Sequence, residues 1–193
     1  MTRTEIQKLK KEIKRLKELA YKDELTGLFN RHGFKEEARK FVSAVVRFGR
    51  TNKRKSFLVK NFGLIVFDID DFKKLNDAYG HLAGDLVLKS LSRFISRRVR
   101  DSDIVARWGG EEIIVGLVGA SESDAFGVAE NIRRGIAGKE LNYNRRKINL
   151  SVSGGVADMV KIGDFEKLFD RADKALYRAK KLGKNRIILY SDL

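Results

Sequence analysis

GLIVFDIDD, residues 63–71, is the part of the sequence that decides the fold. Its first five residues form a continuous apolar run, which is typical of a strand at the centre of a sheet, buried on both faces. The run ends abruptly at Asp68, Asp70 and Asp71. Because carboxylates are rarely placed beside a buried strand for packing, we expect this end of the strand to lie in a functional site.

Helices and further strands surround this run. Apolar spacing predicts helices over 33 to about 49, 84–99, 121–137 and 164–182. Strands are predicted at 104–108 and 112–118, joined as a hairpin across two glycines, and at 148–157 and 187–190. This order indicates an α+β fold, with helices packed against a mixed sheet.

The N-terminal segment, residues 1–22, has a different pattern from the domain predicted at 23–193. Its apolar residues alternate three and four apart, as in a coiled-coil seam, at Ile6, Leu9, Ile13, Leu16 and Ala20. With barely two and a half heptads, such a helix is marginal as a free monomer. A dimerising stalk and a solvated leader helix, or the stub of a longer helix, are both open interpretations.

Composition limits the class of protein. The 193 residues are 42% hydrophobic, enough for one packed domain and a short accessory segment. Cysteine is absent, which excludes disulfides and thiolate metal sites. We find neither an apolar run that could insert into a membrane nor a signal-peptide pattern, and therefore expect a soluble, cytoplasmic protein.

The net charge of +15 raises the question of nucleic-acid binding. Residues 1–60 hold 18 Lys and Arg against 7 Asp and Glu, so most of the excess lies in the leading helices and in the stretch RTNKRK, 50–55. That stretch contains no aromatic side chain for stacking against single strands. We interpret it as a solvated loop, with no nucleic-acid partner, and keep a basic nucleic-acid binder as the less favoured alternative.

Two parts of the sequence could form a metal and phosphate site. Lys73 lies where a short helix is expected after Asp71, and the N–H groups at a helix start can hold phosphate oxygens. Glu111 and Glu112 directly follow the two glycines of the hairpin. If the hairpin lies beside the first strand, Asp68 and Glu111 converge, and hard carboxylate oxygens suit Mg²⁺.

Four motifs, in order, resemble the GGDEF family of diguanylate cyclases. They are DELTGLFNR (23–31), FDIDDFKKLNDAYGH followed by Gly84-Asp85 (67–85), RWGGEEI (107–113), and ADKALYRAK followed by GKNR (172–186). The resemblance implies a five-stranded sheet like the palm of nucleotide polymerases. The usual Phe of the signature is Ile113 here, and we expect it to point into the core.

The resemblance also implies a metal centre that holds Mg²⁺ or Mn²⁺. The carboxylates of Asp68 and Glu111 and the carbonyl oxygen of Ile69 would be its protein ligands, with Glu112 near a second ion. Glu111, Glu112 and Lys73 are the implied catalytic residues, and Glu111 is the candidate proton acceptor.

The substrate implied by the resemblance is GTP. Asn76 and Asp85 would hydrogen-bond the guanine, whose N1–H and exocyclic amine both suit the Asp85 carboxylate. Phe72 and His81 would lie close to the nucleotide. The residues implied for the triphosphate are Lys73, Lys180 and Lys184.

The implied reaction joins two GTP molecules into cyclic di-GMP and releases two pyrophosphates. Each domain binds one GTP, so the active form is a homodimer. Arg100 and Asp103 resemble the family's RxxD site, at which cyclic di-GMP inhibits its own synthesis. Asn131 occupies the place of a second arginine that some relatives use there, and Arg133 is a possible substitute. The alternative function is an inactive module that binds GTP or cyclic di-GMP as a receptor.

Overall fold

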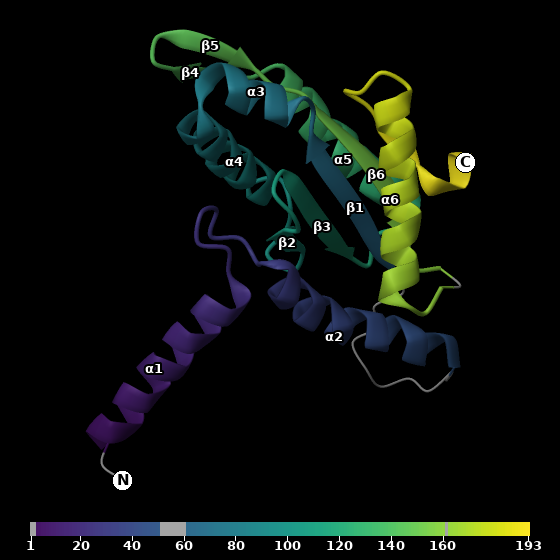
Figure 1. Ribbon diagram of the computed structural model, residues 1–193. Coiled ribbons are helices and arrows are strands. Elements are labelled where there is room, and N and C mark those ends of the chain that lie inside the picture. The colour runs from purple at the N-terminus through teal and green to yellow at the C-terminus, as the bar shows by residue number, and fades with distance from the viewer. Residues whose placement is uncertain (1–2, 51–60, 161) are drawn as a thin grey trace.

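The computed structural model describes residues 3–50, 61–160 and 162–193, so the expected basic loop lies outside it except for Arg50. The helices are α1 (Arg3–Tyr21), α2 (Arg31–Arg50), α3 (Phe72–Tyr79), α4 (His81–Ser96), α5 (Glu122–Ala137), α6 (Phe165–Lys181) and a short 3-10 helix, η1 (Tyr190–Asp192). The strands are β1 (Phe62–Ile69), β2 (Ile104–Arg107), β3 (Glu112–Val118), β4 (Glu140–Tyr143), β5 (Arg146–Asn149), β6 (Val152–Asp158) and β7 (Ile187–Leu189) (Figure 1).

A five-stranded mixed sheet forms the centre of the domain, in the order β2-β3-β1-β6-β7. The middle strand, β1, runs antiparallel to both of its neighbours, β3 and β6. The β6–β7 pair is parallel. The expected α+β class with a five-stranded mixed sheet is therefore confirmed.

Helices cover both faces of this sheet, because β1 alternates its side chains between two apolar clusters. Ile65, Phe67 and Ile69 pack in the cluster that includes side chains of α3, α4 and α5. Leu64 and Val66 pack in the opposite cluster, with side chains of α2 and α6. All eight positions of β1 are buried, as the apolar run predicts. Ile113 is fully buried in the first cluster, as expected.

The prediction of one continuous strand over 148–157 is wrong. The chain instead forms β5, which pairs with β4 in a separate two-stranded sheet, and then β6, which joins the main sheet. The β4–β5 turn is made by Asn144 and Arg145, both with positive φ, of 49° and 63°. Arginine seldom takes this conformation, so the residue types did not indicate a hairpin turn.

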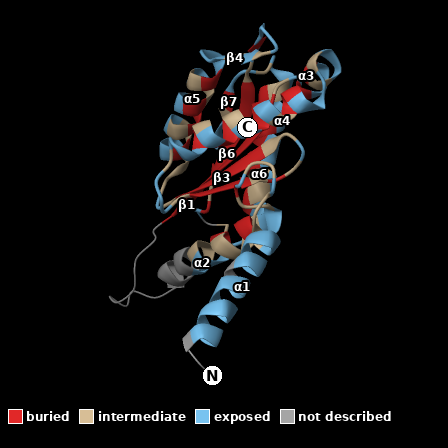
Figure 2. Cartoon of the chain, turned by 90° about the vertical axis from the view of Figure 1, so that its left-hand side faces the viewer, coloured by how far each residue is buried: buried red, intermediate tan, exposed pale blue. Residues whose placement is uncertain are grey.

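Helix α1 projects away from the rest of the domain (Figure 1) and is exposed along almost its whole length (Figure 2). Its seam residues Ile6, Leu9, Ile13 and Leu16 are 39–55% exposed. Its C-terminal end contacts the domain, where the Tyr21 ring stacks on His32 with centroids 5.2 Å apart. Within the described ranges, no helix has both the length and the apolar character needed to cross a membrane.

Candidate active site

The sheet brings the predicted carboxylates together at one end of β1. Asp68 lies opposite Glu112 in the β1–β3 register, and the Ile69 N–H donates to the Glu111 carbonyl oxygen at 3.4 Å. Asp68 is only 6% exposed, whereas Glu111 and Glu112 are half-buried. The hairpin thus lies beside the first strand, which was the condition for Asp68 and Glu111 to converge.

The electrostatics of these carboxylates indicate a site for positive charge. Burial raises the pKa of Asp68, although an ion pair with Lys180 (Nζ to Oδ2, 2.6 Å) partly offsets the effect. Burial and then repulsion by Asp68 raise the pKa of Glu111 and also that of Glu112. A cation bound between them would relieve this mutual repulsion.

The donor set fits a magnesium ion that shares its coordination with a ligand. No three acidic or histidine side chains in the described part of the chain are arranged to hold a metal by themselves. Asp68, Glu111 and the backbone oxygen of Ile69 nevertheless offer hard oxygen donors from the end of one strand and the adjacent turn. Mg²⁺ is usually held by one or two carboxylates, with water and substrate phosphates completing its coordination.

A second cluster, on α3 and α4, forms a cradle for a flat polar group. The Oδ1 atom of Asn76 is buried and has no hydrogen-bond partner in the described part of the chain. A Cβ atom at Gly84 would collide with that same oxygen and would press on the Phe72 ring. Glycine at position 84 therefore lets the Asn76 amide oxygen and the Phe72 ring pack directly against α4. A buried acceptor without a partner is costly, so this cradle is chemically incomplete without a ligand.

The other predicted nucleotide contacts lie around this cradle. Asp85 follows Gly84 directly and is half-buried, and His81 is exposed at the start of α4. Lys73 is exposed in the first turn of α3, which begins without a side-chain cap. The uncapped N–H groups of this turn remain available to an anion.

Lys184 reaches the same region from the loop after α6. Its Nζ atom lies 2.9 Å from Oδ1 of Asp71, the residue before α3. Hydrogen bonds from Lys74 and Lys184 lower the pKa of Asp71 to about 2. Lys180 and Lys184 are thus held by acidic partners here and lie within reach of the carboxylate end of β1.

Arg107 links the turn between β2 and β3 to the N-terminal motif. Its guanidinium donates to the Gly110 carbonyl oxygen at 2.9 and 3.2 Å and lies 3.2 Å from Asp23 Oδ2. Burial alone would raise the pKa of Asp23, but hydrogen bonds from Thr26 and the charge of Arg107 outweigh it and lower the pKa. Sequence reasoning assigned no role to Asp23 or Arg107, since the contact joins residues 84 positions apart.

The predicted RxxD residues line a separate hollow of about 480 Å³ together with Arg98 and Asp124. Asp103 already has backbone partners, because it accepts from the N–H groups of Arg100 at 2.9 Å and Val118 at 3.1 Å. Arg133 was a possible additional contact. Its guanidinium is instead bound to Glu130 and to Asn185, so Arg133 does not supply the missing arginine.

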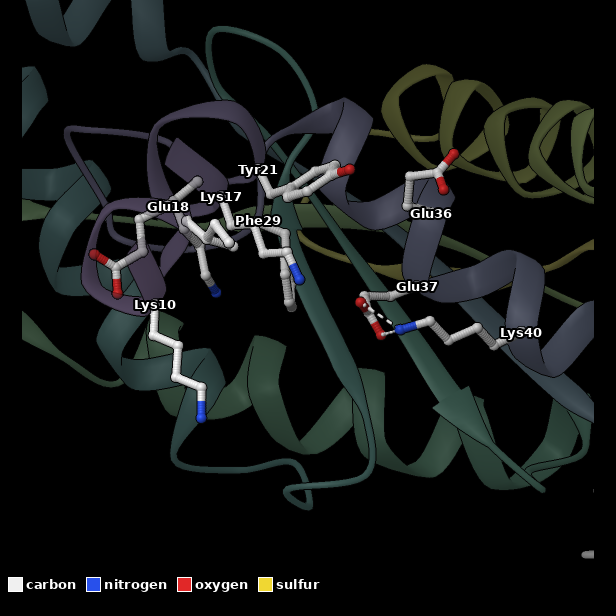
Figure 3. Close-up of a pocket in the computed structure, with 10 residues that line it drawn as sticks. Lys10, Lys17, Glu18, Tyr21, Phe29, Glu36, Glu37 and Lys40 are labelled. Atoms are coloured by element: carbon white, nitrogen blue, oxygen red, sulfur yellow. Dashed lines mark hydrogen bonds and ion pairs between the residues drawn. The ribbon is translucent and has the colours of Figure 1, made fainter. Parts of the chain in front are cut away.

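Another hollow, of about 600 Å³, lies between α1 and α2 (Figure 3). Two of its basic side chains have local partners: Lys40 is bound to Glu37, and Lys22 lies over the Phe29 ring, 3.5 Å from the centroid. The metal-site carboxylates do not line it. We therefore place the candidate active site at the end of β1.

Comparisons with known proteins show the family of this chain. The pattern that defines "Diguanylate cyclase, GGDEF domain" matches residues 20–186. Diguanylate cyclase A of Treponema denticola is 42% identical over 131 residues, which are 67% of this chain and 35% of that protein. The chain therefore belongs to the GGDEF family of diguanylate cyclase domains, and it spans about a third of the length of that relative.

Solved structures are similar over most of the chain. The coiled coil and GGDEF domain of DgcB from Caulobacter crescentus, in complex with c-di-GMP, matches with a TM-score of 0.83 and 28% identity, covering 96% of this chain and 94% of that one. The active GGEEF domain of a diguanylate cyclase from Vibrio cholerae matches with a TM-score of 0.67 and 31% identity, covering 81% and 95%. This chain likewise carries GGEE at 109–112.

Proposed function

We propose that this domain joins two GTP molecules into cyclic di-GMP and releases two pyrophosphates. One observation carries the proposal: Asp68, Glu111 and Glu112 converge beside Lys180, where burial and then repulsion by Asp68 raise the pKa values of both glutamates. Such a cluster suits phosphoryl-type chemistry, in which positioning and charge stabilisation supply most of the catalysis.

The cradle on α3 and α4 binds the guanine. The Asn76 amide, whose oxygen packs against Gly84 without a hydrogen-bond partner among the described residues, pairs with the base edge. The Asp85 carboxylate accepts from the guanine N1–H and exocyclic amine, a pair of donors that adenine does not offer. Phe72 forms part of the floor, and His81 lies at the exposed rim of the cradle.

The lysines around the end of β1 bind the triphosphate. Lys73, Lys180 and Lys184 balance its charge, and the last two exchange their present carboxylate partners for phosphate oxygens. Glu111 accepts the proton of the attacking 3′-hydroxyl. Bound Mg²⁺ or Mn²⁺, held by Asp68, Glu111 and the Ile69 carbonyl with Glu112 near a second ion, would lower the pKa of that hydroxyl and neutralise developing charge.

The working form is a homodimer, because one domain holds one GTP and the reaction needs two. The exposed apolar seam of α1 supports this assembly, with residues 1–22 as the stalk and 23–193 as the catalytic domain. A short tether gives two linked domains an effective concentration of roughly a millimolar. We place this reaction in the cytoplasm, where GTP is supplied.

Cyclic di-GMP also acts as an inhibitor, bound at Arg100 and Asp103. Arginine can fork onto the O6 and N7 atoms of guanine. Since Asp103 is already committed to backbone N–H groups, Arg100 supplies most of the recognition. The hollow that both residues line supports this assignment.

Incubation with GTP and Mg²⁺ followed by chromatography of the products tests the function. The expected products are cyclic di-GMP and pyrophosphate. Tight binding of GTP or cyclic di-GMP without any product would instead establish the alternative, an inactive receptor module. The retention of both metal-site carboxylates and both signature glycines favours the enzyme.

A further inference from the structure

The loop that follows α6 has a backbone that its sequence alone does not favour. Gly183, Lys184 and Asn185 are consecutive residues with positive φ, of 106°, 63° and 46°. For lysine the left-handed region is unfavourable, and such a conformation persists where surrounding contacts enforce it. Lys184, which the proposed function assigns to the triphosphate, lies in the middle of this loop.

Asp70 supplies one of the contacts that fix the loop. Its Oδ2 atom accepts from the Asn185 N–H at 3.0 Å and from the Ser151 hydroxyl at 2.6 Å. Its Oδ1 atom accepts from the hydroxyl of Ser153, a fully buried residue, at 2.6 Å. Both carboxylate oxygens are therefore engaged with β6, the segment before it and the loop. Asp70 is not among the ligands assigned to the metal site.

Arg133, on α5, holds the same loop from the other side. It donates to the Asn185 side-chain oxygen at 2.7 Å. Two further bonds to Glu130, of 2.6 and 2.8 Å, fix the guanidinium, and only 16% of the Arg133 side chain is exposed. Asn185 is thus fastened through its backbone to Asp70 and through its side chain to Arg133.

These contacts determine where the Lys184 amine can lie. Asp70 fixes the backbone immediately after Lys184, while the neighbouring Asp71 accepts the amine itself at 2.9 Å. Two adjacent residues of one loop therefore position the backbone and the charge of a residue more than a hundred positions away. Without Asp70, the strained loop would lose the carboxylate that the Asn185 N–H requires.

We propose that Asp70 is a positioning residue for the reaction: together with Arg133 it holds the Gly183–Asn185 loop so that Lys184 meets the substrate triphosphate. This inference rests on the proposed function. The Asp70 carboxylate accepts from the Asn185 N–H and from two serine hydroxyls, so we expect it to affect triphosphate binding mainly through Lys184. Its loss should therefore weaken triphosphate binding and should have no effect once the Lys184 side chain is gone.

Calorimetric titration with a GTP analogue that carries a methylene group between the α- and β-phosphates tests this, with Mg²⁺ present. Asp70→Asn should weaken binding about tenfold, the effect of losing one charge-assisted hydrogen bond, and so should Lys184→Ala. The double variant should bind no more weakly than Lys184→Ala alone, since both changes remove one interaction. Asp77→Asn, the same chemical change on the exposed face of α3, is the matched control and should bind like the parent.

Arg133→Met gives a second route if Asp70→Asn does not fold. Glu130 keeps Arg134 as a partner at 2.9 Å, so this change leaves no unpaired acidic group. We expect weaker analogue binding that again disappears in the Lys184→Ala background. Parent-like binding by the Asp70→Asn and Arg133→Met variants, or losses that multiply with that of Lys184→Ala, would overturn the positioning role alone. A parent protein that binds no analogue would overturn the proposed GTP site, and this inference with it.

Discussion

The two regions assigned to nucleotides differ in how their carboxylates are partnered. At the end of β1, burial and repulsion raise the pKa values of Glu111 and Glu112. In the RxxD hollow, Asp103 accepts from two backbone N–H groups, and hydrogen bonds from Ser121 lower the pKa of Asp124. The carboxylates of the first region repel one another, whereas those of the second already accept hydrogen bonds.

This difference is the one we expect between a catalytic centre and a binding site for an inhibitor. Carboxylates that repel one another are strongly stabilised by a bound cation, including one that arrives together with the substrate. Compensated carboxylates hold their loop in shape and leave recognition to the neighbouring arginine. Substitutions should therefore change activity at the first region and regulation or stability at the second.

The largest expected effect comes from Glu111→Gln, which keeps the shape of the turn and removes one charge. Turnover of GTP should fall by at least about a hundredfold, because charge stabilisation at the transition state is lost. The melting temperature of the metal-free protein should not fall, because the change relieves repulsion by Asp68. Parent-like turnover by a folded variant would place the active site elsewhere. Glu140→Gln, on β4, is the matched control.

Acidification should weaken metal binding at a higher pH than ordinary carboxylates would require. Bound Mg²⁺ needs Asp68 and Glu111 unprotonated, and both have raised pKa values. Below those values, affinity should fall about tenfold per pH unit for each proton displaced. Stability of the metal-free fold has the opposite sign: these groups favour folding at low pH, and that contribution is lost as the pH rises through their raised pKa values.

Titration with Mn²⁺ as a function of pH measures this linkage. In the Glu111→Gln variant, the slope of log Kd against pH should drop by about one, because one titrating group has been removed. An affinity that does not change with pH down to the ordinary carboxylate range would show that these side chains do not hold the metal.

A smaller effect is expected at the stalk. Replacing Leu9 and Leu16 by Lys should lower specific activity about tenfold at micromolar protein and make it rise with protein concentration, because encounter becomes bimolecular. These substitutions are cleaner than removal of residues 1–21, since the Tyr21 carbonyl oxygen accepts from the Asn30 N–H at 2.9 Å. Lys8→Ala with Lys11→Ala is the control. Equal concentration dependence in the parent and the seam variant would exclude dimerisation through α1.

The smallest effect on the initial rate is expected for Arg100→Ala. Early turnover should stay near the parent value, whereas the slowing that accompanies product accumulation should be relieved. Asp103→Asn should differ from it by also lowering the free energy of unfolding by about 1 kcal/mol, through weaker acceptance from the Val118 N–H. Progress curves of the parent that stay linear as micromolar cyclic di-GMP accumulates would contradict the regulatory role.

Local sequence patterns correctly predicted the structural features that are determined by residues close together in the chain. The apolar run before Asp68 indicated a buried strand, and the two glycines before Glu111 indicated a hairpin that brings carboxylates to its end. Both were correct in the fold, because strand burial and turn chemistry are properties of short segments. The β4–β5 hairpin was missed because its turn uses Arg145 in a conformation that arginine rarely adopts.

Contacts between distant segments could not be predicted in this way. Asp70 occupies the same acidic stretch as Asp68, yet it binds two serine hydroxyls and a loop N–H instead of facing the other carboxylates. Arg133 resembled a free arginine near the RxxD hollow, and only the packing of α5 against the last loop shows its partner. Residue types alone do not show which carboxylates and arginines are paired in this way.

The position of β1 has a consequence for exchange with solvent. The strand is hydrogen-bonded to a neighbour on each side and buried at every position, so its amide hydrogens are protected by the most cooperative part of the domain. Local opening does not reach such a strand, and its amides exchange with deuterium only when the whole domain unfolds. Asp68 ends this strand, whereas Lys184 lies in a loop outside the sheet, held by the contacts of Asn185 with Asp70 and Arg133. We therefore expect Asp68 to keep its position during local opening and to lose it only when the whole domain unfolds.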